Sequence, residues 1–284
     1  MQSLPLSSSG FDTGREADAL LVAEFAGGRT ILRRQHVGYP LHVTRAFYLD
    51  RTRPDVATLY LQSASGGLYA GDRLKLDLVI GENAALNLTT QASTVVHHGR
   101  GIGSVQHQSV RVKDGAFCAV VSDPYVLFPH ADLLIRTTAE VATGGVLIVA
   151  DGFAVHDPHG GGDSFEGFSA ATRILRPNGR LVLSDRGSIR GEELFARFGA
   201  LGGMSAAATM LVIAPPDRVA DVAEIEAAVD ACGCLAGASK APNEAGLAMR
   251  LLAPNGGTLA RGIEAAFHVA GQAALGIELA RRRK

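Results

Sequence analysis

Pairs of alternating apolar segments joined by a short turn recur along the middle of the chain. The first pair has leucine or isoleucine at every second position from Leu74 to Ile80, a break at Gly81-Glu82-Asn83 and a second apolar run. The same pattern recurs at 110–121, 139–150 and 173–184, with turns at Asp114-Gly115, Gly144-Gly145 and Asn178-Gly179. A period of two indicates strands that bury one face, and these residues favour tight turns. The turns lie about thirty to thirty-five residues apart, as repeated supersecondary units do.

The pattern changes after about residue 190. Segment 217–233 carries apolar residues at helical spacing, with Asp217 as its expected N-cap and Gly233 near its end. Segments 208–214 and 246–253 are typical of strands, and 258–283 of a terminal helix. The closing Arg281 to Lys284 would then be a solvated helix end, favoured by the helix dipole.

These patterns predict a mainly β fold. We expect a layered, sandwich-like array of antiparallel hairpins that share a core, with a few helices, mostly toward the C-terminus. The 284 residues are expected to form a single domain, 1–284, with residues 1–17 as a loose tail. The three cysteines, Cys118, Cys232 and Cys234, form no disulfide framework and are expected to be small buried or half-buried side chains.

The charge and hydropathy pattern excludes several partner classes. The net charge is −1, from 27 basic and 28 acidic residues, so we expect no non-specific attraction to nucleic acid or to an anionic membrane. The N-terminal residues lack a basic region followed by an apolar core, and no apolar run approaches the length of about 18 residues that a membrane span needs. We therefore expect a cytoplasmic protein.

A glycine-rich stretch, SGGLYAGDRL at 65–74, raises the question of nucleotide binding. A phosphate-binding loop requires a Gly-Lys pair at the start of a helix, and the chain contains no Gly-Lys pair. The residues after Gly71 alternate as a strand, so no helix N-terminus faces this loop, and the stretch at 99–104 fails for the same reason. We expect no bound nucleotide.

The histidines offer a weak metal signal. His97 and His98 are adjacent, so on a strand they would point to opposite faces. His156, His159 and Asp163 lie in one glycine-rich loop and could meet around a transition metal, although an exposed loop without metal is the stronger interpretation. The other four histidines considered are expected to pack within strands: His36, His42, His107 and His130.

The chain has no recognisable catalytic nucleophile. No G-x-S-x-G, Cys-His or Ser-x-x-Lys signature occurs. Five acids are expected at strand ends, as solvated turn residues: Asp72, Asp123, Asp151, Asp163 and Asp185. The residues alone thus favour a binding or scaffold role without catalytic residues.

The glycine-rich stretch and the segment after it resemble the signature of the urease accessory protein D family (UreD/UreH). That family carries G-G-L-x-x-G-D-x-L, a strand, a turn and L-T-T-Q-[AG]-[AS]-T. The matching positions include Gly66, Gly67, Leu68, Gly71, Asp72, Thr89, Thr90 and Gln91. Segments 38–48, 123–141, 183–191 and 237–253 are similar to further landmarks, so the resemblance covers roughly residues 18–280. The chain departs from the family at His97-His98, where a tyrosine is common.

The resemblance implies a non-catalytic chaperone or scaffold for urease maturation. Family members join urease accessory protein F and the GTPase accessory protein G, and the assembly delivers nickel to apo-urease. Nickel would be bound transiently and no cofactor tightly, with Asp72 and Asp163 as candidate residues on the nickel path and no fixed metal site. A structural role for Asp72, capping backbone N–H groups, stays open beside this one. The alternative from another class is a metal-dependent hydrolase that uses His156, His159 and Asp163.

Overall fold

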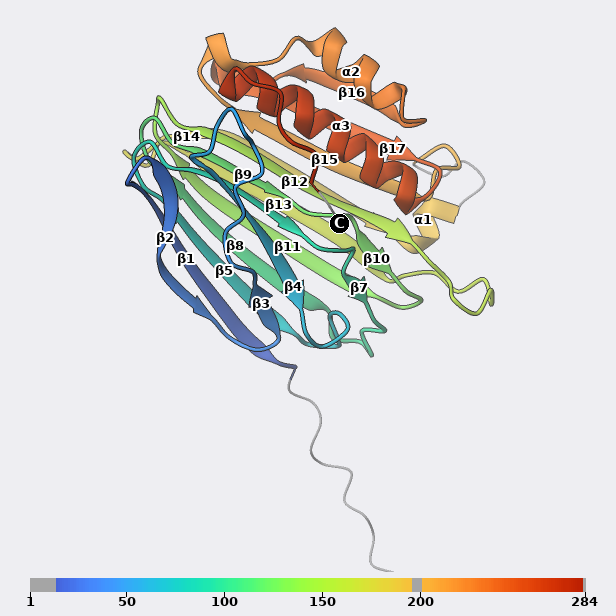
Figure 1. Ribbon diagram of the computed structural model, residues 1–284. Coiled ribbons are helices and arrows are strands. Elements are labelled where there is room, and N and C mark those ends of the chain that lie inside the picture. The colour runs from blue at the N-terminus through green and yellow to red at the C-terminus, as the bar shows by residue number, and fades with distance from the viewer. Residues whose placement is uncertain (1–13, 196–200, 283–284) are drawn as a thin grey trace, which may run out of the picture.

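The computed structural model describes residues 14–195 and 201–282, in which two β-sheets and a helical layer stack on one another (Figure 1). The first sheet has seven strands in the order β14-β13-β11-β8-β5-β1-β2. Its strands are β1 Glu16–Ala26, β2 Arg29–Val37, β5 Arg73–Ile80, β8 Ser104–Val112, β11 Asp132–Val141, β13 Gly167–Leu175 and β14 Leu181–Arg190.

The second sheet has ten strands, eight of them in the order β16-β17-β15-β12-β9-β6-β4-β3, with β10 between β12 and β7. Its strands are β3 Leu41–Val43, β4 Val56–Ser63, β6 Ala85–Thr90, β7 Val95–Val96, β9 Phe117–Val121, β10 Tyr125–Leu127, β12 Val146–Val155, β15 Ala206–Ile213, β16 Leu235–Lys240 and β17 Gly246–Ala253. The helical segments are α1 Gly191–Phe195, α2 Val222–Asp230, α3 Gly256–Leu275, and the 3₁₀ turns Pro216–Arg218 and Pro242–Glu244. The prediction of a mainly β fold with a few helices toward the C-terminus is confirmed.

The prediction of antiparallel hairpins is wrong for three of the four repeats. At the turns near Gly81, Gly115 and Gly145 the chain leaves the seven-stranded sheet and enters the ten-stranded sheet. Strands β5, β8, β11 and β13 therefore pair in parallel in one sheet, and β4, β6, β9 and β12 in the other. Of the four predicted turns, only the one at Asn178-Gly179 joins an antiparallel pair, β13 and β14. Alternation identifies the buried face of a strand but not its neighbour, and both arrangements bury one face.

The regular spacing of the turns has a structural reason, because one repeat is one circuit through both sheets. Successive turns stack and hydrogen-bond to one another. Asn83 N donates to Asp114 O at 3.2 Å, and Gly144 N donates to the Asp114 carboxylate at 2.9 Å. The turn residues therefore align the parallel strands that follow them.

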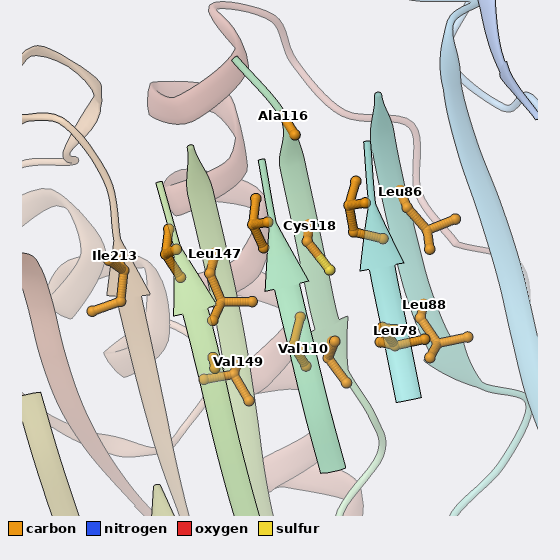
Figure 2. Close-up of a cluster of buried hydrophobic side chains, with 14 of the residues drawn as sticks. Leu78, Leu86, Leu88, Val110, Ala116, Cys118, Leu147, Val149 and Ile213 are labelled. Atoms are coloured by element: carbon orange, nitrogen blue, oxygen red, sulfur yellow. The ribbon is translucent and has the colours of Figure 1, made fainter. Parts of the chain in front are cut away.

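Two hydrophobic layers hold the three structural layers together. Figure 2 shows the one between the sheets, where Leu78 and Val110 of the seven-stranded sheet lie near Leu88, Cys118 and Leu147 of the other. The second lies between the ten-stranded sheet and the helices. Strands such as β6 and β9 are buried on both faces for this reason.

The helix boundaries differ from those predicted. Asp221, not Asp217, is the N-cap of α2, because its carboxylate accepts from the backbone N–H of Ala223 at 2.8 Å and of Glu224 at 3.2 Å. Helix α3 ends at Leu275, where Gly276 takes the left-handed conformation with φ 71°. Arg282 is therefore not on a solvated helix end: it is buried and forms an ion pair with Glu264.

The segment expected to be a loose tail is only partly described. Residues 1–13 lie outside the described residues, whereas Glu16 and Ala17 begin β1 and Arg15 forms an ion pair with Asp72. No helix in the described ranges is long and apolar enough to cross a membrane.

Candidate functional site

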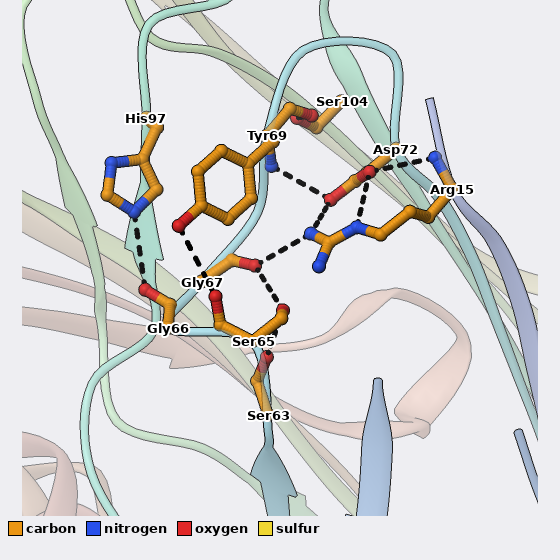
Figure 3. Close-up of polar contacts among 9 residues, drawn as sticks. All are labelled: Arg15, Ser63, Ser65, Gly66, Gly67, Tyr69, Asp72, His97 and Ser104. Atoms are coloured by element: carbon orange, nitrogen blue, oxygen red, sulfur yellow. Dashed lines mark hydrogen bonds and ion pairs between the residues drawn. The ribbon is translucent and has the colours of Figure 1, made fainter. Parts of the chain in front are cut away.

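The glycine-rich stretch connects β4 to β5 and packs against the chain around β7 (Figure 3). Gly67 has φ 136°, and a Cβ atom there would lie 2.3 Å from the carbonyl oxygen of Val95, so only glycine fits. Next to it, Leu68 is buried; its N–H donates to Val95 O at 2.8 Å and its carbonyl accepts from His97 N at 2.9 Å. The motif thus joins two strand ends by close backbone approach.

Asp72 ties this loop to the start of β1. Its buried carboxylate accepts from Tyr69 N at 2.8 Å, from Arg15 N at 3.0 Å and from Arg15 Nε at 3.0 Å, and forms an ion pair with the Arg15 guanidinium (Figure 3). Burial alone would raise the pKa of Asp72, but the hydrogen bonds from Arg15 and Tyr69 and the Arg15 charge outweigh it and lower the pKa. These contacts match the structural role, in which Asp72 caps backbone N–H groups. A role on the nickel path stays a prediction.

Four amides of the loop face inward and donate to oxygen atoms of the chain. The N–H groups of Leu68 and Gly71 donate to Val95 O and Ile102 O, and those of Tyr69 and Asp72 donate within the loop. A phosphate-binding loop instead directs several amides at its ligand. The loop therefore differs from a phosphate-binding loop, and the absence of a bound nucleotide stays a prediction.

The second motif, at the end of β6, links neighbouring strands of the ten-stranded sheet. The Thr89 hydroxyl donates to Val121 O at 2.7 Å, and the Thr90 hydroxyl accepts from Asp123 N at 2.9 Å. The Gln91 amide oxygen accepts from the Gln62 amide. The polar residues of this motif therefore hold β4, β6 and the end of β9 together.

Histidines gather beside the glycine-rich loop. His97 stacks on Tyr69 with ring centroids 4.3 Å apart, while His98 lies 4.8 Å from His130. The rings of Tyr69, His97, His98 and His159 line a surface hollow of about 680 Å³. His97 and His98 follow β7 instead of lying on a strand, and both line this hollow, so the expectation that they point to opposite faces is not confirmed. His36, His42 and His107 lie on strands but are exposed instead of packed, and His130 lies outside the named strands with φ 58°.

The described part of the chain does not assemble the metal site that the hydrolase alternative requires. Asp157 orders its loop by accepting from His159 N at 3.0 Å and Gly162 N at 2.8 Å. Asp163 lies 4.0 Å from His130 Nε2 instead of joining His156 and His159. Within the residues that the structure describes, no three His, Cys, Asp or Glu side chains are arranged to hold a metal ion. A hydrolytic metal centre needs such a set of three protein ligands.

A second polar site lies between the sheets. Asp151, Thr209 and Arg250 stand side by side on β12, β15 and β17 and line a cavity of about 710 Å³. Arg250 donates to the Thr209 hydroxyl at 2.8 Å and to Asp185 of the opposite sheet at 2.5 Å. The other walls of the cavity are largely apolar, including Phe153, Phe168 and Ile189.

Asp151 has an unusual environment for a carboxyl group. Burial and then the charge of Asp185 raise its pKa to about 7, against the opposing effect of Arg250. Perturbed carboxyl groups in cavities are often functional. The expectation that Asp151 and Asp185 are turn residues at strand ends is wrong, since both lie within strands.

The sequence contained one signal for this cavity. Asp151 follows four apolar residues and an alanine in β12, on the same face as Leu147 and Val149, which pack in the core. An acid that continues a buried face is costly unless it has a partner or a function. Its neighbours Asp185 and Arg250, which are 34 and 99 residues away in the sequence, could not be identified without the fold.

Comparison with known proteins identifies relatives along the whole chain. The family described as UreD urease accessory protein matches residues 15–284. Urease accessory protein UreD 3 of Bradyrhizobium sp. (strain ORS 278) is 59% identical over 280 residues, covering 99% of both chains. UreD 1 of Bradyrhizobium sp. (strain BTAi1) is 61% identical over 284 residues, covering 100% of both. UreD 1 of Methylorubrum populi is 43% identical over 272 residues, covering 95% of this chain and 92% of its own.

Proposed function

The chain belongs to the UreD family of urease accessory proteins, which are not enzymes, and we propose that it helps deliver nickel to apo-urease. In this proposal it acts in the cytoplasm as a chaperone or scaffold, in a complex with urease accessory protein F and the GTPase accessory protein G. GTP hydrolysis belongs to the G partner. The inward-facing amides of the glycine-rich loop support that division of labour.

One structural observation supports a nickel path through this protein, namely the carboxylate-lined cavity between the sheets. Asp151 of β12 and Glu193 of α1 line the cavity, and Arg250, which also lines it, reaches Asp185 of the opposite sheet. Carboxylate oxygens hold nickel less firmly than imidazole or thiolate does, which suits transient passage. With a pKa of about 7, Asp151 exchanges its proton near neutral pH, and a nearby divalent ion would favour its ionised form.

The nickel path is tested with Asp151→Asn, which keeps the size of the side chain and removes its charge. We expect lower urease activity in cells that co-express urease and its accessory set at limiting nickel, with the F and G partners still recovered in a pull-down. Asp217→Asn, at an exposed acid far from the cavity, is the matched control. Normal activation by the Asp151 variant would remove the cavity from the path.

Asp72 and Asp163 are further candidates for the same path. Asp72→Asn and Asp163→Asn are tested in the same cells and the same pull-down. Loss of activation with an intact complex would support a nickel role. Normal activation would leave Asp72 as a structural residue that joins Arg15 to the loop.

The scaffold role is tested separately by binding. The purified chain should bind its F-type partner and become more soluble with it, since a docking face is then covered. A stable monomer without any binding to that partner would contradict the proposal.

A further inference from the structure

Three arginines cluster on the outer face of the seven-stranded sheet, which is turned away from the helices (Figure 1). Arg136 of β11 and Arg186 of β14 lie directly across from Ala171 of β13, on either side of it. Arg173 lies two residues further along β13, on the same face. From strand geometry, Arg136 and Arg186 are about 10 Å apart and Arg173 is about 7 Å from Ala171. We name Arg136, Arg173 and Arg186 the arginine cluster.

Among the described residues, no member of the arginine cluster has an acidic partner. Arg73 and Arg111 of the same face also form no ion pair there, but each lies directly across from a glutamate, Glu16 and Glu140. Other basic side chains of this sheet do have an acidic partner. Lys75 pairs with Asp77 at 2.7 Å, His36 lies 3.6 Å from Asp18, and Arg33 lies 3.8 Å from Glu24. At the rim, Arg190 pairs with Glu192 at 3.1 Å. Within residues 14–195 and 201–282, no carboxylate forms an ion pair with a member of the cluster.

The surface between the three arginines carries only small side chains. Ala171 occupies its centre, and Thr138, Ser169 and Ser184 surround it. The exposed imidazole of His107 lies directly across from Arg136. Small side chains leave the guanidinium groups open to a flat partner, and arginine pairs with carboxylates through two parallel hydrogen bonds.

The stability of the chain alone does not account for this arrangement, because like charges on neighbouring strands repel one another. Arginine is the cation most suited to ion pairs at interfaces. We propose that the arginine cluster is a docking surface for a carboxylate-rich protein surface within the urease maturation assembly. This inference rests on the proposed function and adds the face of the chain that makes the contact.

A protein partner fits the cluster better than a nucleic acid does. The net charge of the chain is −1, and Asp77 and Glu140 lie on the same face within a few residues of the cluster. A nucleic-acid site would need a longer basic stripe along the phosphate backbone. A compact group of three arginines matches a local group of carboxylates instead.

The test compares two triple variants with the same change in net charge. The first is Arg136→Glu, Arg173→Glu and Arg186→Glu. The control is Arg51→Glu, Lys113→Glu and Arg218→Glu, at exposed cations outside this face. Binding of each variant and of the unchanged chain to purified apo-urease, F-type and G-type proteins is measured at about 50 mM and about 300 mM NaCl, because salt screens exposed charges. Thermal unfolding verifies folding.

We expect the cluster variant to lose at least about tenfold in affinity for one of the three proteins at the lower salt, and to lose the salt dependence of that contact. The control variant should bind as the unchanged chain does. Equal binding by both variants would overturn the docking surface alone, whereas no binding by the unchanged chain would overturn the proposed function and the inference with it. If duplex DNA competes for the arginine cluster, the cluster binds nucleic acid, and the proposal of a protein partner is overturned.

Discussion

Replacing Glu264 by Gln should destabilise the protein by about 2 kcal/mol at neutral pH. Glu264 lies on α3 and forms an ion pair with Arg282, whose Nε donates to it at 3.1 Å. Arg282 is held in place by a hydrogen bond to Val121 O at 3.0 Å and by the ring of Phe267, 4.4 Å from its guanidinium carbon. The pair therefore fastens the end of the described chain to the helix and to the ten-stranded sheet.

The magnitude follows from the pKa of Glu264. Burial alone would raise it, but hydrogen bonds from His268 and Arg282 and their charges lower it from 4.5 to about 2. At 1.36 kcal/mol per pKa unit, this shift corresponds to about 3 kcal/mol. Because the Glu264 side chain is 30% exposed, solvent screening reduces the expected value to about 2 kcal/mol.

The sign of the pH dependence is determined by the lowered pKa. The stabilisation is complete above the unfolded value of about 4.5 and is lost as the pH falls toward about 2. The difference between the unchanged chain and Glu264→Gln should therefore shrink by about half between pH 7 and about pH 3. Urea unfolding followed by far-UV circular dichroism at several pH values measures this difference.

Glu278→Gln is the control, because Glu278 is exposed, and it should change the free energy of unfolding by less than about 0.5 kcal/mol. A Glu264→Gln difference that stays constant from pH 7 to about pH 3, or that is below about 0.5 kcal/mol at pH 7, would refute the reasoning.

Three further predictions concern the glycine-rich loop. Gly67→Ala should lower the free energy of unfolding, measured with urea, by more than about 2 kcal/mol, because its Cβ would meet Val95 O. Gly101→Ala, with open space around it, should lower it by only about 1 kcal/mol. Equal losses would contradict the argument that Gly67 allows a close backbone approach. Asp72→Asn should lower the free energy of unfolding by about 2 kcal/mol, which is more than the loss of a capping hydrogen bond alone, since Arg15 loses its charged partner. A loss below about 0.5 kcal/mol would contradict this. Isothermal titration with GTP and Mg²⁺ should give no saturable heat, and micromolar binding would show that the loop amides reorient.

The amino-acid sequence determined the elements of this protein well. The alternation from Leu74 to Ile80 identified a strand with one buried face, and the turn residues marked where strands end. Both are local properties, set by side-chain period and by backbone conformations that glycine and asparagine tolerate. The glycine and threonine motifs identified the family, because close backbone approach at Gly67 leaves few alternatives.

The tertiary structure alone decided how those elements pair. The chain crosses between sheets at Gly81 instead of folding back, and α3 packs on the second face of strands such as β12 and β15. It also decided the partners of charged side chains, placing Arg15 on Asp72 and Arg250 between the two sheets near Asp151. Such contacts join residues far apart in the chain. They depend on which strands become neighbours, and local periodicity is the same for every choice of neighbour.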